Sequence, residues 1–189
     1  MTRSFYHYTH VIRKDLAQKF CYQNLHQVPK LTHISLHMST GKAILDPSIL
    51  VPCAFALETV SGQHPIVTRA QRSVAAFKLR EGMVLGCSVT LRNQSMYEFL
   101  DKLVVQVLPR VPEFSGLSMD SADSMGHYTF GIPSLLSFPE LDPYHEILAR
   151  LGGLQVTCTT NAPTSEEALA LLSGFQLPFA HHEHQNAQL

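Results

Sequence analysis

The amino-acid sequence predicts a single α+β domain, a mainly antiparallel sheet of about five strands with helices on one side and a protruding basic hairpin loop. Segments with alternating apolar and polar residues recur among segments with helical spacing, without the regular order of a parallel sheet. A chain of 189 residues with 45% hydrophobic and 15% charged residues suits one domain with its own core. No apolar run approaches the roughly 18 residues that span a bilayer, so we expect a soluble protein with no membrane partner.

A helix, a strand and a second helix are expected first. Residues 8–20 carry apolar side chains at helical spacing. In residues 30–38 apolar and polar side chains alternate, which predicts a strand with one buried face. The polar side of this strand is His33, Ser35 and His37. Asp46 followed by Pro47 is typical of a helix start, and we expect that helix to end near residue 60.

A basic hairpin is expected over residues 61–92, with strands at 64–69 and about 85–92. Its cations are Arg69, Arg72, Lys78, Arg80 and Arg92, against the single acid Glu81. Its apex consists of small residues and one aromatic residue: Ser73, Val74, Ala75, Ala76 and Phe77. Such a loop suits contact with a nucleic-acid backbone, although local composition leaves an ordinary surface hairpin open.

The second half predicts two more helices and two more strands. Residues 95–108 form the clearest amphipathic helix, and a short strand at 127–132 is expected within long loops over 110–146. Residues 154–160 alternate again, and Thr164 with Glu167 is a capping box that opens a last helix, to about residue 174. We expect the domain to cover residues 1–179, and residues 180–189 to form a flexible tail.

The outward face of the predicted sheet is unusual for a surface in contact with water. Its side chains are short, neutral hydrogen-bonding groups with one arginine: His33, Ser35, His37, Ser88, Thr90, Arg92, Gln155, Thr157 and Thr159. Such groups suit contact with RNA riboses and phosphates. Residues 1–110 also carry thirteen Lys or Arg against six acids, whereas residues 111–189 carry one against nine. One part of the protein is therefore expected to meet a polyanion.

An enzyme or a metalloprotein is the less favoured hypothesis, and we expect no cofactor, no metal and no catalytic residue. The four cysteines have no C-x-x-C spacing, which favours buried reduced thiols in an intracellular protein. Eleven histidines are present, but His33 and His37 have no evident third ligand, and the tail cluster of His181, His182 and His184 is expected to be mobile. No glycine-rich phosphate loop or nucleophile motif occurs.

Three long segments carry a resemblance to a known family. They are VPKLTHISLHMSTGKA at 28–43, TRAQRSVAAFKLREG at 68–82 and GGLQVTCTTNAPTSEEALALLSGFQLPF at 152–179. With shorter matches between them, they resemble universal large-subunit ribosomal protein five, the family that binds 5S rRNA, over about residues 8–179. The segment at 68–82 is specific, because no general constraint of a fold demands that run.

The resemblance implies a non-enzymatic part of the central protuberance of the large ribosomal subunit, beside neighbouring ribosomal proteins. It implies that the sheet and nearby loops hold 5S rRNA or other large-subunit rRNA, and that loop 70–82 touches the transfer RNA in the peptidyl site. The rRNA-binding residues are then His33, His37, Gln63, His64, Arg69, Ser88, Thr90 and Arg92. The tRNA-contact residues are Arg72, Ser73, Val74, Ala75, Ala76, Phe77, Lys78 and Arg80.

Several positions depart from the family pattern. The chain has a pI of about 6.8 where family members are usually strongly basic, and Ser88 and Ser115 stand where the family has basic residues. His37 replaces the usual Asn and His64 the usual Lys, whereas Gln63, Thr90 and Arg92 match. Fewer phosphate contacts mean weaker RNA binding. The tRNA loop keeps its cations while the 5S platform has lost several. Because proteins can replace rRNA contacts in organellar ribosomes, this selective loss leads us to expect a ribosome of the mitochondrial matrix, with a bacterial or plastid ribosome as the alternative.

A second hypothesis remains open within the same family. The acidic residues after position 110 could dock basic ribosomal neighbours, and the protein would then be held in the ribosome by protein contacts alone, without binding 5S rRNA. The cations around the hairpin apex argue against this hypothesis, since a pure protein binder has little reason to keep them.

Overall fold

The computed structural model describes residues 2–44, 46–148 and 151–180, and these residues form a five-stranded antiparallel sheet in the order β2-β3-β1-β5-β4. The strands are β1 (Leu31–Ser39), β2 (Ile66–Arg69), β3 (Val84–Leu91), β4 (Tyr128–Ile132) and β5 (Leu154–Thr160). The first strand lies in the centre and pairs with β3 and β5. The predicted α+β class and the predicted strand count are confirmed.

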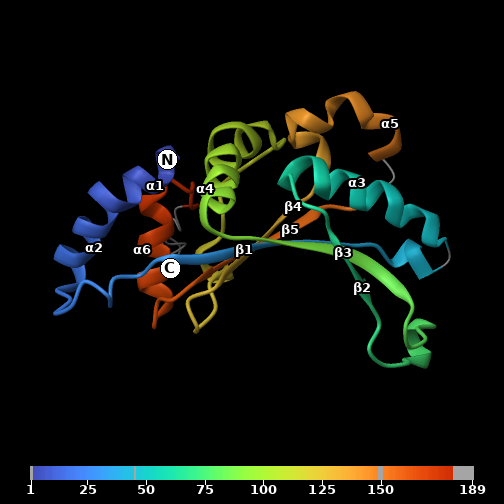
Figure 1. Cartoon of the computed structure of the whole chain (residues 1–189), viewed down its shortest axis with the longest axis horizontal. Coiled ribbons are helices and arrows are strands. Elements are labelled where there is room, and N and C mark those ends of the chain that lie inside the picture. Colours follow the sequence, from blue (N-terminus) through green and yellow to red (C-terminus); the bar gives the residue numbers. More distant parts are fainter. Residues whose placement is uncertain (1, 45, 149–150, 181–189) are drawn as a thin grey trace, which may run out of the picture.

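The helices cover one face of this sheet and leave the other face open (Figure 1). They are α1 (Arg3–His7), α2 (Arg13–Phe20), α3 (Leu50–Ser61), α4 (Asn93–Lys102), α5 (His145–Leu148) and α6 (Ser165–Gly174). A π-helical turn at Tyr8–Ile12 joins α1 to α2, and a second one at Leu103–Val107 extends α4. The hairpin between β2 and β3 extends beyond the helical layer at one end of the molecule.

The core lies between the helices and the covered face of the sheet, as the alternation predicts. Ile34, Leu36 and Met38 of β1 are buried, and so are the inward side chains of β3 and β5. They pack with buried residues of the helices, such as Leu57 of α3 and Leu100 of α4. Every second strand residue points the other way, so one buried face fixes the side chains of the open face.

Two helix starts follow the predicted capping chemistry. The Asp46 carboxylate accepts a hydrogen bond from the Ser48 N–H at 3.1 Å and begins a 3-10 turn at Pro47–Ile49 that leads into α3. The Thr164 hydroxyl accepts from the Glu167 N–H at 3.4 Å at the start of α6. Both caps are confirmed, and α3 ends at Ser61, close to the predicted end.

Other expectations need correction. The N-terminal helix starts at Arg3 rather than residue 8, because Asp101 accepts hydrogen bonds from the hydroxyl and backbone N–H of Ser4. Residues 110–146 are more ordered than the predicted long loops, since 3-10 turns at 119–121, 135–137 and 139–144 and the start of α5 interrupt them. Cys21 is exposed, so the prediction of buried thiols is wrong for that residue and right for Cys53, Cys87 and Cys158.

The last residues that the structure describes make ordered backbone contacts. The Ala180 N–H donates to the Leu117 carbonyl at 2.9 Å, so ordered backbone contacts extend one residue into the segment expected to be a flexible tail. Residues 181–189, including the histidines of that tail, lie outside the described residues. Within the described ranges, no helix is long and apolar enough to cross a membrane.

Candidate nucleic-acid interface

The open face of the sheet carries rows of hydrogen-bonding side chains that run across neighbouring strands. In one row, Ser88 of β3, His37 of β1 and Gln155 of β5 are register partners. A second row joins Thr90, Ser35, Thr157 and Thr129 across four strands. None of these positions carries a carboxylate, so a phosphate backbone laid on the rows meets donors and neutral acceptors without repulsion.

A third row lies at the end of the open face, beside the start of α4. His33 pairs in register with Thr159, and the exposed Arg92 follows the last residue of β3. Desolvation, with the charges of Arg92 and His127, lowers the pKa of His33 below its usual value. The His33 ring is therefore neutral near pH 7 and can both donate and accept, while Arg92 supplies the positive charge of this end.

The open face is hollowed toward its β4 edge. A depression of about 610 Å³ lies over this edge, with His37, Gln155, Thr129 and Gly131 among its lining residues. The Thr129 hydroxyl donates to the Thr157 hydroxyl at 3.1 Å, which orients both groups on the surface. Sequence reasoning missed Thr129 because its strand was expected only as a short segment within loops.

Gln63 and His64 lie between α3 and β2, and both side chains are exposed. The Gln63 backbone N–H donates to the Ser61 hydroxyl at 3.2 Å, which fixes the turn after α3. The His64 Nδ1 lies 3.6 Å from a carboxylate oxygen of Glu58, with both side chains largely in water. An exposed pair of this kind is weak, so it leaves His64 available to a phosphate.

The hairpin loop is an ordered projection. Ala70 and Met83 share a backbone hydrogen bond of 2.8 Å at its base, and Val74 and Leu79 bond to each other near the apex, at 3.0 and 3.1 Å. A 3-10 turn at Ala75–Phe77 forms the apex, and Lys78 closes it with a left-handed backbone (φ 54°). The predicted apex is therefore held in one conformation and needs less ordering on binding.

The apex and its cations point into solvent. Phe77 is 69% exposed, an unusual position for an unpartnered phenyl ring, and Val74 is exposed beside it. The side chains of Arg72, Lys78 and Arg80 are exposed, and none has an ion-pair partner among the described residues. Arg69 differs, because its guanidinium donates to the Gly82 carbonyl at 3.3 Å.

The hairpin loop and the open face join along β3, since the same strand leaves the hairpin and crosses the open face. The structure thus brings the predicted strand residues together on one face. The hairpin that carries the predicted loop residues extends from one end of the sheet (Figure 1). Acidic residues form ion pairs on the helical side, where Glu140 lies 2.7 Å from Lys102 and Asp142 lies 3.2 Å from Arg110.

Metal chemistry finds no support in this arrangement. His33 and His37 lie on the same strand face, each two residues from Ser35. In the part of the chain that the structure describes, no three His, Cys, Asp or Glu side chains lie close enough to hold a metal ion.

Comparison with protein families gives two adjoining matches. A family model described as ribosomal protein L5 matches residues 24–80, and a second model, for the C-terminus of the same ribosomal family, matches residues 84–179. The first match contains β1, β2 and the hairpin apex, and the second begins with β3 and ends after α6. Together they cover the open face and the loop described above.

Whole-chain relatives have similar lengths. The sequence is 44% identical to the large ribosomal subunit protein uL5 of Nitrosomonas eutropha over 179 residues, which cover 95% of this chain and 99% of that protein. It is 45% identical to the protein of the same name from Variovorax paradoxus, again over 95% of this chain and 99% of the relative. The uL5 of Mesoplasma florum is 45% identical over 92% of this chain and 95% of the relative.

Proposed function

The chain belongs to the ribosomal protein L5 family, and from this premise we propose that it binds 5S rRNA on the open face of its sheet within the large ribosomal subunit. Members of this family are structural proteins of the ribosome, so the protein is not an enzyme. The binding step proposed here needs only hydrogen bonds and charge, both of which the open face offers.

One observation carries the proposal. The open face presents rows of Ser, Thr, Gln and His side chains that end at Arg92 and contain no carboxylate. RNA helices are recognised mainly through 2′-hydroxyls and phosphates, which such short donors and acceptors match. The platform residues of this proposal are His33, His37, Gln63, His64, Arg69, Ser88, Thr90 and Arg92.

The hairpin loop takes a second role in the proposal. We assign its exposed apex, from Arg72 to Arg80, to contact with the transfer RNA in the peptidyl site. The loop presents an exposed phenyl ring and three exposed cations that have no ion-pair partner among the described residues. This combination suits an RNA with unstacked bases or an exposed backbone. In this proposal the protein belongs to the central protuberance, and its acidic residues after position 110 face neighbouring ribosomal proteins.

The cellular compartment of the protein depends on which ribosome it belongs to. The relatives compared above are bacterial, which is consistent with the cytoplasm of a bacterium and gives the mitochondrial prediction no support. The near-neutral pI and the lost basic positions still motivate that prediction. Fluorescence of a tagged copy in the source cells separates the two, since mitochondrial accumulation contradicts the bacterial alternative.

Crosslinking tests the two RNA contacts together. Particles are purified through a tag on this protein, irradiated, and the crosslinked RNA is sequenced. Crosslinks from the open face to 5S rRNA and from the loop to tRNA are expected. Crosslinks to large-subunit rRNA and tRNA without 5S rRNA would contradict the platform assignment, and their complete absence would favour a protein held by protein contacts alone.

Measuring the affinity of the protein for 5S rRNA adds a quantitative test. We expect Arg92→Gln to weaken binding of 5S rRNA by roughly tenfold and to lower the salt dependence by about one counterion. Arg110→Gln is the matched control, because Arg110 is an exposed arginine that pairs with Asp142 on the helical side. Equal losses in both variants would mean that general charge, rather than the open face, determines affinity.

A further inference from the structure

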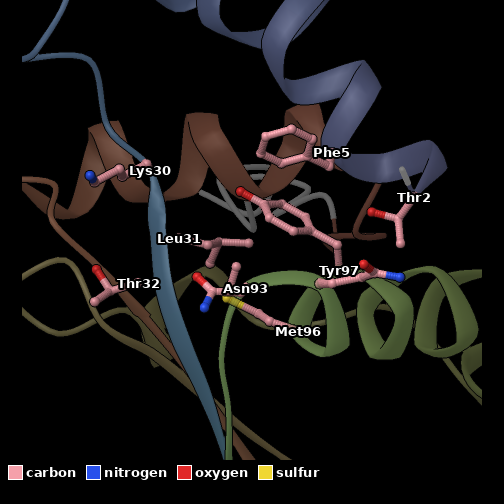
Figure 2. Close-up of a pocket in the computed structure, with 9 residues that line it drawn as sticks. Thr2, Phe5, Lys30, Leu31, Thr32, Asn93, Met96 and Tyr97 are labelled. Atoms are coloured by element: carbon pink, nitrogen blue, oxygen red, sulfur yellow. The ribbon is translucent and has the colours of Figure 1, made fainter.

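A cavity of about 510 Å³ lies between α1, the beginning of β1 and the beginning of α4 (Figure 2). Leu31, Met96 and Tyr97 form an apolar floor, and the ring of Phe5 covers it from α1. The Phe5 and Tyr97 rings meet edge to face, with centroids 5.3 Å apart. A flat, apolar group can therefore lie against aromatic and thioether surfaces in this cavity.

Two hydroxyl groups in the cavity have no protein partner. Tyr97 is only 6% exposed, and among the described residues nothing accepts from or donates to its hydroxyl, which Figure 2 shows directed across the cavity toward Lys30 and Leu31. The Thr2 hydroxyl is buried at the cavity wall and also lacks a partner within the described part of the chain. Buried polar groups are rarely left unsatisfied, so the buried Thr2 hydroxyl, together with a Tyr97 hydroxyl that faces the cavity, indicates a ligand with polar edges.

The Tyr97 hydroxyl stays neutral in this setting. Burial, with the neighbouring Tyr8 hydroxyl, raises the pKa of Tyr97 to about 12. The group therefore keeps its proton at physiological pH and can both donate and accept. Tyr8 itself donates to the Pro29 carbonyl at 3.0 Å, which leaves Tyr97 as the hydroxyl that faces the open space.

The rim of the cavity favours an anion. Asn93 and Gln94 begin α4, and the residue before them, Arg92, provides no side-chain cap for the first N–H groups of the helix. Lys30 stands on the opposite rim, where its own backbone N–H is fixed by the Asn161 side chain at 2.6 Å. Of the residues that the structure describes, none with a carboxylate side chain lines the cavity.

The cavity lies at the end of the sheet where β1 begins and β3 ends. Thr32, on its rim, precedes His33, and Asn93 follows Arg92, so the cavity opens beside the basic end of the proposed RNA platform. An RNA strand that binds Arg92 and His33 would therefore pass beside the neighbouring residues Thr32 and Asn93, which line this cavity. RNA loops and bulges offer such unstacked nucleotides to proteins.

We propose that this cavity receives one unstacked nucleotide of the bound RNA, with the base on the floor of Leu31, Met96 and Tyr97 beside the Phe5 ring, and the phosphate at the rim of Lys30 and α4. The Tyr97 and Thr2 hydroxyls bond the polar edge of the base. The inference rests on the proposed RNA platform, and it adds a subsite that reads a single unpaired nucleotide. A free nucleotide has the same chemistry, so the test separates the two sources.

Methyl-labelled methionine gives a direct probe of the cavity. Met96 is buried in the cavity floor, whereas Met38, Met83, Met119 and Met125 lie outside it and serve as internal references. The NMR signal of Met96, assigned with Met96→Leu, is followed during titration of the full chain with short oligouridine, with a fully paired RNA duplex of the same length, and with uridine 5′-monophosphate. We expect oligouridine to shift Met96 and the duplex to leave it unchanged.

Matched variants test the assigned contacts. Tyr97→Phe keeps the ring and should weaken the binding of oligouridine about fivefold, the usual effect of one lost hydrogen bond. Its stability should not fall, because the hydroxyl has no partner to lose. Asn93→Asp keeps the shape of the side chain and suits the first turn of a helix, but it places a carboxylate at the rim. Because this carboxylate repels the phosphate, we expect the affinity for oligouridine to fall about tenfold. Gln106→Glu adds the same charge at an exposed position near the far end of this helix and should change nothing.

The outcomes separate this proposal from the platform. A Met96 signal that no probe moves overturns the subsite, whatever happens to 5S rRNA binding at Arg92. A Met96 response to oligouridine in a protein that does not bind 5S rRNA overturns the proposed function and supports the subsite. A response to uridine 5′-monophosphate alone overturns the RNA source and assigns the cavity to free nucleotides. Equal affinity of Tyr97→Phe and the unchanged chain also contradicts the proposal.

Discussion

The Arg69 guanidinium donates to the Gly82 carbonyl at 3.3 Å and joins the two sides of the hairpin at its base. The Ser73 hydroxyl, farther along the loop, accepts from the Glu81 N–H at 3.0 Å. Arg72, Lys78 and Arg80 have no ion pair within the described residues. The loop cations thus divide into one that shapes the hairpin and three that are free for a ligand.

Arg69→Gln is expected to loosen the hairpin base while it removes one charge. The lost hydrogen bond is exposed, so the free energy of unfolding should fall by less than about 1 kcal/mol. Local opening is the more sensitive readout, and we expect faster amide hydrogen exchange at Gly82, whose N–H donates to the Ala70 carbonyl at 2.9 Å. Arg72→Gln removes the same charge and should leave that exchange rate unchanged; equal acceleration would contradict the distinction.

Joint replacement of Arg72, Lys78 and Arg80 by Ala should impair translation and leave incorporation into the large subunit largely intact. The three side chains are exposed on a projecting loop, so their loss removes up to three phosphate contacts without disturbing the core. Translation by purified variant ribosomes measures the first effect, and mass spectrometry of the subunits measures the second.

The control for that variant removes the same charge elsewhere. Arg13, Lys14 and Lys19 belong to α2, where alanine is a good helix former, and their joint replacement should spare translation. Subunits that lack the hairpin variant would contradict the assignment of the loop to tRNA, because they would mean that the loop holds the protein in the particle.

Arg92→Gln should raise the pKa of His33. Desolvation is the larger cause of the lowered pKa and remains, but the charge of Arg92 adds to it and is removed. Titration of the His33 ring signal by NMR measures the change, with His10, a surface histidine on the first helical segment, as the internal reference. An unchanged His33 pKa would mean that Arg92 and His33 are not coupled across the end of the sheet.

The lowered pKa of His33 also determines how its contribution to the stability of the protein changes with pH. A histidine whose folded pKa lies below its unfolded value near 6.5 binds fewer protons in the folded state. Its contribution to stability is therefore complete above pH 6.5 and declines as the pH falls through 6.5 toward the folded pKa. Arg92→Gln should make this acid decline smaller.

Local rules predicted most of the fold. Alternation alone identified the covered and open sides of β1, β3 and β5, because one buried face determines the other. The caps at Asp46 and Thr164 were predictable from short-range chemistry, since each bonds a backbone N–H two or three residues ahead. The open-face residues His33, Ser88, Thr90 and Arg92 follow from the same alternation and lie together in the structure.

Contacts between distant segments were not predictable in this way. Ser4 bonds Asp101 and Tyr22 bonds Glu167, and these pairs are 97 and 145 residues apart in the sequence. The first pair holds the N-terminal helix against α4 and so creates the cavity beside Tyr97. A single sequence has no periodic signal for such a pair. Its helical spacing also does not distinguish Tyr97, which lines the cavity, from an aromatic residue packed in the core.

Gly86→Ala should destabilise the protein through the sheet itself. Gly86 lies in β3 opposite Ser39, and a Cβ atom there would come within 2.2 Å of the Met38 carbonyl oxygen and 3.0 Å of the Ser39 Cα. Backbone atoms cannot yield as a flexible side chain does, so β1 and β3 must separate locally. We expect the free energy of unfolding to fall by about 2 kcal/mol, measured by urea denaturation and circular dichroism.

Gly131→Ala is the matched change, because Gly131 also lies in a strand of this sheet but a Cβ atom there meets nothing within 4 Å. Alanine costs less chain entropy than glycine on folding, so this variant should be neutral or slightly more stable. Equal losses in the two variants would mean that both strands need glycine for its flexibility. A loss confined to Gly86→Ala locates the requirement in the close approach of β1 and β3, where the hairpin joins the open face.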